Sequence, residues 1–217
     1  MNIKIINYNF NKYNFQKFLS YKFFNKKQPD QLFNTKLKKI NLNKLKLEIK
    51  NLKNNEEFKQ LYKEFINNVI KKLFNYKIYH QKFPNIRIFC SKDPNGLVPF
   101  HSDSWYNHSK GETNFWLPFH WVSASESLQI INLKKSMILE KKILKKKLDI
   151  SQINKLLISQ AKPIKCNYGS FAMFSPFHIH GNVLNKTSYH RISMDFRIVK
   201  HNSSFKQKKL GGYFDIE

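Results

Sequence analysis

The sequence feature that most constrains the fold is the alternation of polar and apolar side chains from Arg191 to Ile198 within HRISMDFRIV, residues 190–199. Successive side chains of a β-strand point to opposite faces, so this segment predicts a strand with one face in a core and one polar face. The apolar positions are Ile192, Met194, Phe196 and Ile198, and the polar positions are Arg191, Ser193, Asp195 and Arg197.

Several shorter segments upstream are also typical of strands. They are NIRIFC (85–90), NFWLPFHWV (114–122), SLQIIN (127–132), KPIKC (162–166) and SFAMFS (170–175), with DPNG (93–96) as a turn. Many short strands that follow a helical region predict a mainly β fold with flanking helices (α+β), as a sandwich or jelly roll.

The chain of 217 residues is expected to form a single domain. Within residues 1–83, expected to be a partly helical support region, the segment Glu56–Phe74 has apolar residues at helical spacing and predicts an amphipathic helix outside a sheet. Residues 84–200 form the expected β core, interrupted by a Lys-rich helical insertion or lid at 134–160, and 201–217 is a C-terminal tail.

The net charge of +25 comes almost entirely from lysine in a chain also crowded with Asn, Ile and Phe. We interpret it as a solvated, compositional lysine surface, so a nucleic-acid partner is not expected, although the charge leaves it open. No apolar run approaches the ~18 residues of a membrane span, and the N-terminus lacks the apolar block of a signal peptide. With only Cys90 and Cys166, which form no disulfide framework, we expect a cytoplasmic protein. The oligomeric state is not predicted.

Residues that are rare in this composition gather in one part of the chain. The three arginines are Arg87, Arg191 and Arg197, and the three tryptophans are Trp105, Trp116 and Trp121. Where lysine is the common cation, an arginine indicates a site that needs a planar and permanently charged group. The chemistry is therefore expected between residues 84 and 197.

His101 and Asp103 are separated by one residue, a spacing that places both side chains on the same side of an extended segment. A third ligand from His178-Ile179-His180-Gly181-Asn182 would complete a site of two histidines and one carboxylate. Such a site binds non-haem iron(II) and leaves coordination positions open for a co-substrate and oxygen. His178 and His180 both remain candidates on spacing alone.

Arg191 and Ser193 lie on the same polar face of the last strand. A guanidinium can hold a carboxylate through two hydrogen bonds, and a hydroxyl adds one more. The pair therefore predicts a binding site for the distal carboxylate of 2-oxoglutarate. An ion pair between Arg191 and Asp195, which share this face, is the structural alternative.

His-x-Asp, a distant His and then Arg-x-Ser resembles the 2-oxoglutarate/Fe(II) dioxygenase superfamily, whose core is a double-stranded β-helix. The strings VPFHSDSWYNHSKGETNFWLPFHWV and FSPFHIHGNVLNKTSYHRISMDFRIV are similar to StrG-type oxygenases of streptomycin and related biosynthetic clusters. The resemblance covers residues 84–200. It implies Fe(II), 2-oxoglutarate and O₂ as cofactors, His180 as the third ligand because it lies in His-Gly-Asn, and Asn114 as a donor to 2-oxoglutarate.

The expected reaction is hydroxylation of a small molecule in a biosynthetic pathway. Trp105, Trp116 and Arg197 are candidates for the substrate pocket, and Arg197 could instead support Asp103. Three alternatives stay open: an AlkB-like nucleic-acid demethylase, a non-enzymatic cupin-like binding module, and a basic nucleic-acid-binding protein.

Overall fold

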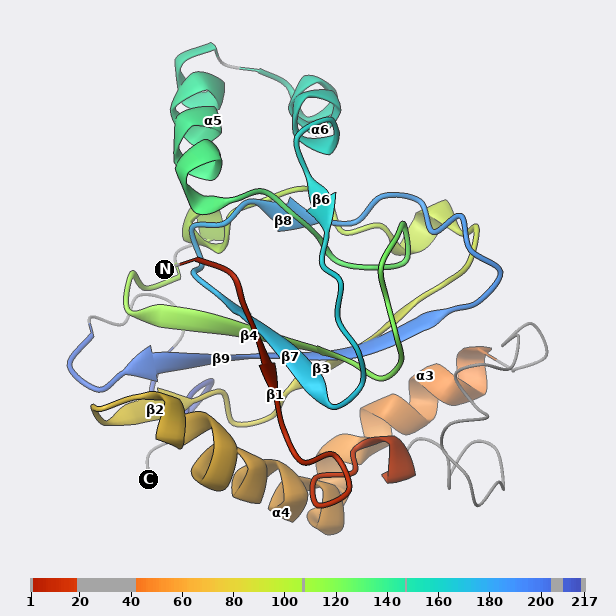
Figure 1. The fold of residues 1–217 in the computed structure, drawn as a ribbon, viewed down its shortest axis with the longest axis vertical. Helices are drawn as coiled ribbons and strands as arrows, with labels where there is room; N and C mark the ends of the chain where they lie inside the picture. The colour runs from red at the N-terminus through yellow and green to blue at the C-terminus, as the bar shows by residue number, and fades with distance from the viewer. Residues whose placement is uncertain (1, 19–41, 107, 147, 204–208, 216–217) are drawn as a thin grey trace.

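The computed structural model describes residues 2–18, 42–106, 108–146, 148–203 and 209–215. Two antiparallel sheets lie one above the other, with helices outside both (Figure 1). This confirms a mixed fold of antiparallel sheets with flanking helices, while the double-stranded β-helix stays a prediction.

The large sheet carries most of the strands. Its order is β1 (Lys4–Asn7), β7 (Ser170–Phe174), β4 (Glu112–Pro118), β9 (Arg191–Lys200) and β2 (Ile78–His80), and β3 (Asn85–Phe89) also pairs with β9. The small sheet has the order β6 (Lys162–Pro163), β5 (Gln129–Ile130) and β8 (His180–Gly181). All the strand pairs are antiparallel.

The outer face of the large sheet is covered by α3 (Leu42–Asn51) and α4 (Glu56–Phe65), the latter continued by a π-helical turn at Ile66–Ile70 and a 3-10 turn at Lys71–Leu73 (Figure 1). Asn55 caps α4 by accepting a hydrogen bond from the backbone N–H of Phe58 at 2.8 Å. The amphipathic helix predicted over Glu56–Phe74 is thus confirmed, together with its packing on a sheet.

The alternation of β9 separates two environments. Its apolar residues enter the main core against α4, as do Phe115 of β4 and Phe171 of β7. The intervening residues of β4 and β7, Trp116 and Phe174, enter a second core between the two sheets. The polar face of β9 therefore points toward the space between the sheets, where the candidate site lies.

The Lys-rich insertion forms two helices, α5 (Leu133–Lys146) and α6 (Ile150–Ile158), above the small sheet (Figure 1). A capping box between Asp149 and Gln152 starts α6. Leu139 and Leu157 pack on Phe100 and Ile179, the neighbours of His101 and His180. The helical prediction for 134–160 is confirmed.

The ends of the chain join the core. Residues 1–53 give weak sequence signals, yet β1 pairs with β7 and α3 covers the sheet, while residues 19–41 lie outside the described ranges. In the tail, Phe214 is fully buried and bridges Gln81. Among the described helices, none combines the length and apolar character needed to cross a bilayer.

Phe65 lies at the centre of the main core, with ring contacts to Tyr8, Phe15, Phe171 and Phe196 at centroid distances of 5.1–6.3 Å. We expect Phe65→Ala to lower the free energy of unfolding by about 3–5 kcal/mol, because it opens a cavity that rigid neighbours cannot fill. Urea unfolding followed by circular dichroism measures this loss. Ile138→Ala, at a residue 58% exposed, is the matched control and should change it by less than about 0.5 kcal/mol. Equal effects of the two variants would contradict this assignment of the core.

Candidate metal centre

The two histidines of the predicted site face each other across a backbone bridge. His101 and His180 exchange both N–H···O hydrogen bonds at 2.9 Å, and their ring centroids are 4.6 Å apart. His180 belongs to β8 and His101 precedes a 3-10 segment at Asp103–Tyr106. Residues 79 positions apart in sequence are thus placed side by side by a strand register.

Asp103 completes the cluster. Its Oδ1 lies 3.5 Å from His101 Nε2 and 4.0 Å from His180 Nε2. One ligand atom from each of the three residues lies within 4.8 Å of the others, the only such group among the described His, Cys, Asp and Glu residues. The extended segment expected around His101 and Asp103 gives way to a 3-10 turn at Asp103, but the two side chains still converge.

The outer nitrogen of each imidazole fixes its protonation. Nδ1 of His101 donates to the carbonyl oxygen of Pro99 at 2.8 Å, and Nδ1 of His180 donates to that of His178 at 2.9 Å. A carbonyl only accepts, so each Nδ1 carries a proton, and Nε2 is the ring nitrogen that faces Asp103. Burial lowers the pKa of His180 to about 4, against the opposing effect of Asp103, so this ring is neutral at pH 7.

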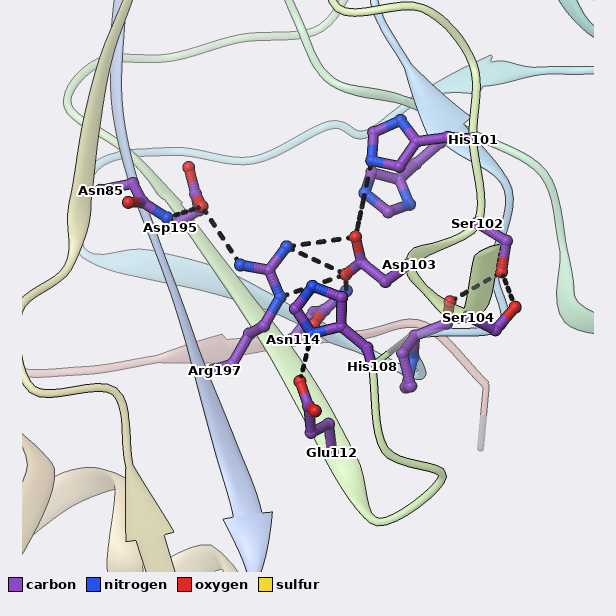
Figure 2. Close-up of polar contacts among 12 residues, drawn as sticks. Asn85, His101, Ser102, Asp103, Ser104, His108, Glu112, Asn114, Asp195 and Arg197 are labelled. Carbon is purple, nitrogen blue, oxygen red and sulfur yellow. Dashed lines mark hydrogen bonds and ion pairs between the residues drawn. The ribbon is translucent and has the colours of Figure 1, made fainter. Parts of the chain in front are cut away.

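Asp103 is itself held from the large sheet (Figure 2). Arg197 Nη2 lies 3.1 Å from Oδ1 and 3.0 Å from Oδ2, and Arg197 Nε is 3.2 Å from Oδ2. Asn114 Nδ2 donates to Oδ2 at 2.6 Å. Burial raises the pKa of Asp103, but His101, His180 and Arg197 together hold it well below its usual range. The carboxylate is therefore ionised and fixed.

Asn114 and Arg197 thus differ in part from their sequence expectations. The amide nitrogen of Asn114, expected to reach 2-oxoglutarate, donates to Asp103, while its Oδ1 is buried without a partner in the described structure. Of the two roles open to Arg197, the geometry favours support of Asp103. Both residues also line a pocket that His101 and His180 border.

Arg191 is buried at 3% exposure between the rings of Phe89 and Trp116, with its guanidinium carbon 4.9 and 5.6 Å from their centroids. Nη1 donates to the carbonyl oxygen of Glu126 at 3.1 Å. Within the described residues, Arg191 Nε and the hydroxyl of Ser193 are buried with no hydrogen-bond partner. Burial lowers the pKa of Arg191 to about 10, so it remains a cation at pH 7.

The alternative ion pair between Arg191 and Asp195 does not form. Asp195 Oδ1 accepts instead from Nε of Arg87 on β3, at 2.6 Å. The ion pair between Arg87 and Asp195 was not predicted from the sequence, although Arg87 is one of only three arginines and shares a face of its predicted strand with Phe89.

One pocket, with a cavity volume of about 70 Å³, opens onto these groups. It is lined by residues of both sheets, including His101, His180, Trp116, Arg191 and Arg197. Of the two tryptophans expected there, Trp116 lines the pocket. Trp105 instead turns to α5, where its indole N–H donates to Glu140 at 2.6 Å, because it packs with the apolar side of that helix.

His178, the other candidate for the third ligand, lies outside the cluster. Its Nδ1 donates to the carbonyl oxygen of Ser175 at 3.1 Å, and its ring packs edge-on against Phe174. Of the two histidines, the structure brings His180 to Asp103.

Two further buried contacts stabilise the segment after Asp103. His108, for which the sequence shows no partner, lies 2.7 Å from Glu112 Oε2 through its Nδ1, and Glu112 Oε1 accepts from the backbone of Ser109 at 2.7 Å. The backbone N–H of His108 also donates to the carbonyl of Asp103 at 3.4 Å. This closed turn links the carboxylate to β4.

The α5–α6 pair is hydrogen-bonded to both segments that carry the cluster. Ser136 Oγ accepts a hydrogen bond from the backbone N–H of Ile179 at 3.0 Å. Asn154 Oδ1 accepts one from the backbone N–H of Phe100 at 3.4 Å. Glu140 accepts one from the indole N–H of Trp105 at 2.6 Å. Residues 134–160 were expected to form an insertion or a lid. Their helices hold the two segments that carry the cluster in place.

The comparison with curated proteins gives one relative. The streptomycin biosynthesis protein StrG of Streptomyces griseus is 24% identical over 127 residues, which cover 58% of this chain and 49% of StrG. The chain thus spans about half the length of the curated relative it matches. No protein-family model matches the sequence.

Among solved structures, a non-heme monooxygenase, the ThoJ–nickel complex, has a TM-score of 0.48 at 12% identity and covers 69% of this chain and 55% of its own. HygX from Streptomyces hygroscopicus, with nickel and 2-oxoglutarate bound, has a TM-score of 0.48 at 7% identity, over 68% and 65% of the two chains. Since these scores are below 0.5, the function has to be inferred from this chain's own residues.

The support of Asp103 by Arg197 gives a testable expectation. Arg197→Gln should weaken binding of Mn(II), measured by electron paramagnetic resonance, by roughly 10–100-fold, as expected for loss of a group that orients a ligand. The pKa of Asp103 should rise in this variant because a cation is lost, so metal release on acidification should begin at a higher pH. Tyr213→Phe, which removes a 3.1 Å hydrogen bond from Arg197 and a 2.8 Å hydrogen bond to Gln81 but leaves the contacts between Arg197 and Asp103, should have a smaller effect. Unchanged affinity in Arg197→Gln would show that Asp103 does not depend on this arginine.

Proposed function

We propose that this chain is a 2-oxoglutarate- and Fe(II)-dependent oxygenase that acts on a small molecule. The observation that carries the proposal is that a candidate set of metal ligands and an arginine with an unpartnered donor lie on one pocket. A cluster of two imidazoles and one fixed carboxylate lies on it, and so does Arg191, a buried arginine whose Nε has no partner among the described residues.

The cluster suits iron(II). Two imidazole nitrogens and one carboxylate oxygen on one side of a metal leave positions open for other ligands, the arrangement typical of non-haem iron(II) oxygenases. His101, Asp103 and His180 would hold the metal, and the hydrogen bond at each Nδ1 leaves Nε2 as the nitrogen that would coordinate it. Arg197 and Asn114 keep the carboxylate from rotating away.

Arg191 suits the far carboxylate of the co-substrate. A buried N–H or hydroxyl without a partner costs free energy, of about 1–3 kcal/mol, and an anionic ligand at the same place removes that cost. Arg191 Nε and Ser193 Oγ are two such groups on one face of β9. The rings of Phe89 and Trp116 on the guanidinium hold it in position and lower the local dielectric.

Iron(II) with 2-oxoglutarate and O₂ supplies an oxidant for a substrate C–H bond, while the co-substrate becomes succinate and CO₂. The protein's own residues bind and orient. His101, Asp103 and His180 hold the metal, Arg191 and Ser193 hold the co-substrate, and Trp116 and Phe174 give the pocket apolar walls that exclude water. No side chain needs to act as an acid or base.

The similarity to StrG supports a biosynthetic small molecule as the substrate. The whole-protein activity is proposed and not transferred, because the match spans only part of each chain. An AlkB-like activity is the competing possibility. Succinate formation above the uncoupled background should rise with a small metabolite, tested from a panel, and stay flat with methylated single-stranded oligonucleotides. Demethylation that persists at about 0.2 M salt, where non-specific binding is weakened, would overturn the small-molecule assignment.

The metal ligands can be tested by replacement. We expect each of three variants to abolish stoichiometric Fe(II) binding under anaerobic conditions: His101→Ala, Asp103→Ala and His180→Ala. Each removes one ligand, and the two ligands that remain are too few to hold the metal. His178→Ala is the matched control, since this histidine is a buried near neighbour outside the cluster, and it should retain the metal. The reverse result for His178 and His180 would reassign the third ligand.

The co-substrate site can be tested separately. Arg191→Ala should keep the metal but weaken 2-oxoglutarate at least about tenfold, because a carboxylate loses its charged partner. The affinity is followed by the weak visible charge-transfer band of the anaerobic iron complex. Ser193→Ala should weaken it less, and Arg191→Lys, which keeps the charge in case the alanine variant is unstable, should lie between the two. An unchanged affinity in both Arg191 variants would place the carboxylate elsewhere.

A further inference from the structure

All three arginines of this lysine-rich chain line the same pocket. Arg191 and Arg197 have roles in the proposed function, and Arg87 has none. β3 pairs with β9 so that Arg87 lies opposite Ser193, with Asn85 opposite Asp195 and Phe89 opposite Arg191. Paired residues share a face of the sheet, so Arg87 stands among the polar residues of β9.

Arg87 is held at one end and open at the other. Its Nε donates to Asp195 Oδ1 at 2.6 Å. The second oxygen, Oδ2, accepts from Asn85 at 2.9 Å and lies 4.0 Å from Arg197 Nη1 (Figure 2 shows Asp195 between Asn85 and Arg197). Both oxygens of Asp195 are thus engaged. A guanidinium has five N–H donors, and the hydrogen bonds among the described residues use only the one on Nε of Arg87.

Stability does not explain this arginine. The Arg87 side chain is 48% exposed, and an ion pair with such an exposed partner contributes little to folding. A lysine, the common cation of this chain, could make a single contact with Asp195. A planar cation whose inner edge is fixed and whose outer nitrogens are open is suited to bind a second anion through two parallel hydrogen bonds.

The surroundings of Arg87 are cationic on both sides. Inside the pocket, Asp103 already faces Arg197 and the proposed metal, and Asp195 is shared by two arginines. Outside, Arg87 borders a groove lined by Lys46 and Lys50 of α3 and by Lys53 of the 3-10 turn at Leu52–Asn54, and no acidic side chain is among the described residues that line it. An anion at the outer edge of Arg87 therefore faces lysines, and the nearest carboxylate, Asp195, is already shared by Arg87 and Arg197.

We propose that Arg87 binds an anionic group, a phosphate or a carboxylate, of the small-molecule substrate at the mouth of the pocket. Asp195 and Asn85 hold the guanidinium, and the substrate extends from Arg87 toward the cluster. This inference rests on the proposed function and adds the class of substrate.

Paramagnetic relaxation tests it with no need for turnover. The full chain is loaded with Mn(II) and 2-oxoglutarate at about 0.2 M salt, which screens scattered lysines. The probes are methyl phosphate against neutral trimethyl phosphate, by ³¹P relaxation, and acetate against acetamide, by ¹H relaxation. At least one anion should show an enhancement about tenfold above its neutral match, because only the anion gains charge-assisted hydrogen bonds. The responding anion identifies phosphate or carboxylate.

Variants locate the binding site. Arg87→Gln should reduce the anion's enhancement to near that of the neutral probe, and Arg87→Lys, which keeps charge but not the planar fork, should retain only part of it. Lys165→Gln, which removes a positive charge from a different groove, should behave as the unmodified protein. Equal enhancements for anion and neutral probe, or no change in Arg87→Gln, would overturn the inference.

Three further results separate failure of this inference from failure of the proposed function. Failure of the unmodified protein to bind Mn(II), or to form succinate from 2-oxoglutarate with Fe(II), would overturn the proposed function itself. Success there with no response to the anions would overturn only the role of Arg87. Displacement of the anion by a methylated oligonucleotide that is then demethylated would assign the cationic groove to nucleic acid and overturn the small-molecule substrate.

Discussion

The ion pair between Arg197 and Asp103 joins the large sheet to the loop that carries two of the three cluster residues. A buried carboxylate is costly unless it is paired and hydrogen-bonded. Asn114 and Arg197 face each other in register on β4 and β9, and both bond Asp103. The position of the carboxylate is thus set by strand pairing, and the loop follows it. The same two strands place Phe115 against Phe196 on the opposite face, where their rings stack at 4.9 Å.

The histidines are fixed from the other side. His180 lies on the small sheet, pairs with His101 through the backbone, and is followed by Gly181. A Cβ on Gly181 would lie 2.8 Å from the Cα of Phe100, so only glycine lets the two segments approach this closely. The bonds from α5 and α6 to Ile179 and Phe100 hold the same pair of segments. Two sheets and a helical pair thus support the cluster, as a site that orients its ligands requires.

The sequence predicted what depends on local periodicity. β9 and α4 were predictable because their apolar residues recur at the strand and helix periods, and convergence of His101, Asp103 and His180 was expected from spacing and resemblance. β1 and α3 were not, because their Lys- and Asn-rich segments take their structure from pairing with β7 and packing on the core. The partners of Trp105 and Asn114 depend on tertiary contacts: Glu140 is 35 residues from Trp105, and Arg197 faces Asn114 only through the register of β4 and β9.

The three arginines can be ordered by how far the fold already satisfies them. Arg197 donates to both oxygens of Asp103 and to Tyr213, so little of it remains for a ligand. Among the described residues, Arg191 has one acceptor, a backbone carbonyl, and its Nε is buried and unpartnered. Arg87 is fixed through Nε and is half exposed. Because a buried donor without a partner costs more than an exposed one, Arg191 has the stronger requirement for an anion and suits a co-substrate present in every turnover. Arg87, whose outer nitrogens water can satisfy, suits a group that arrives and leaves with the substrate.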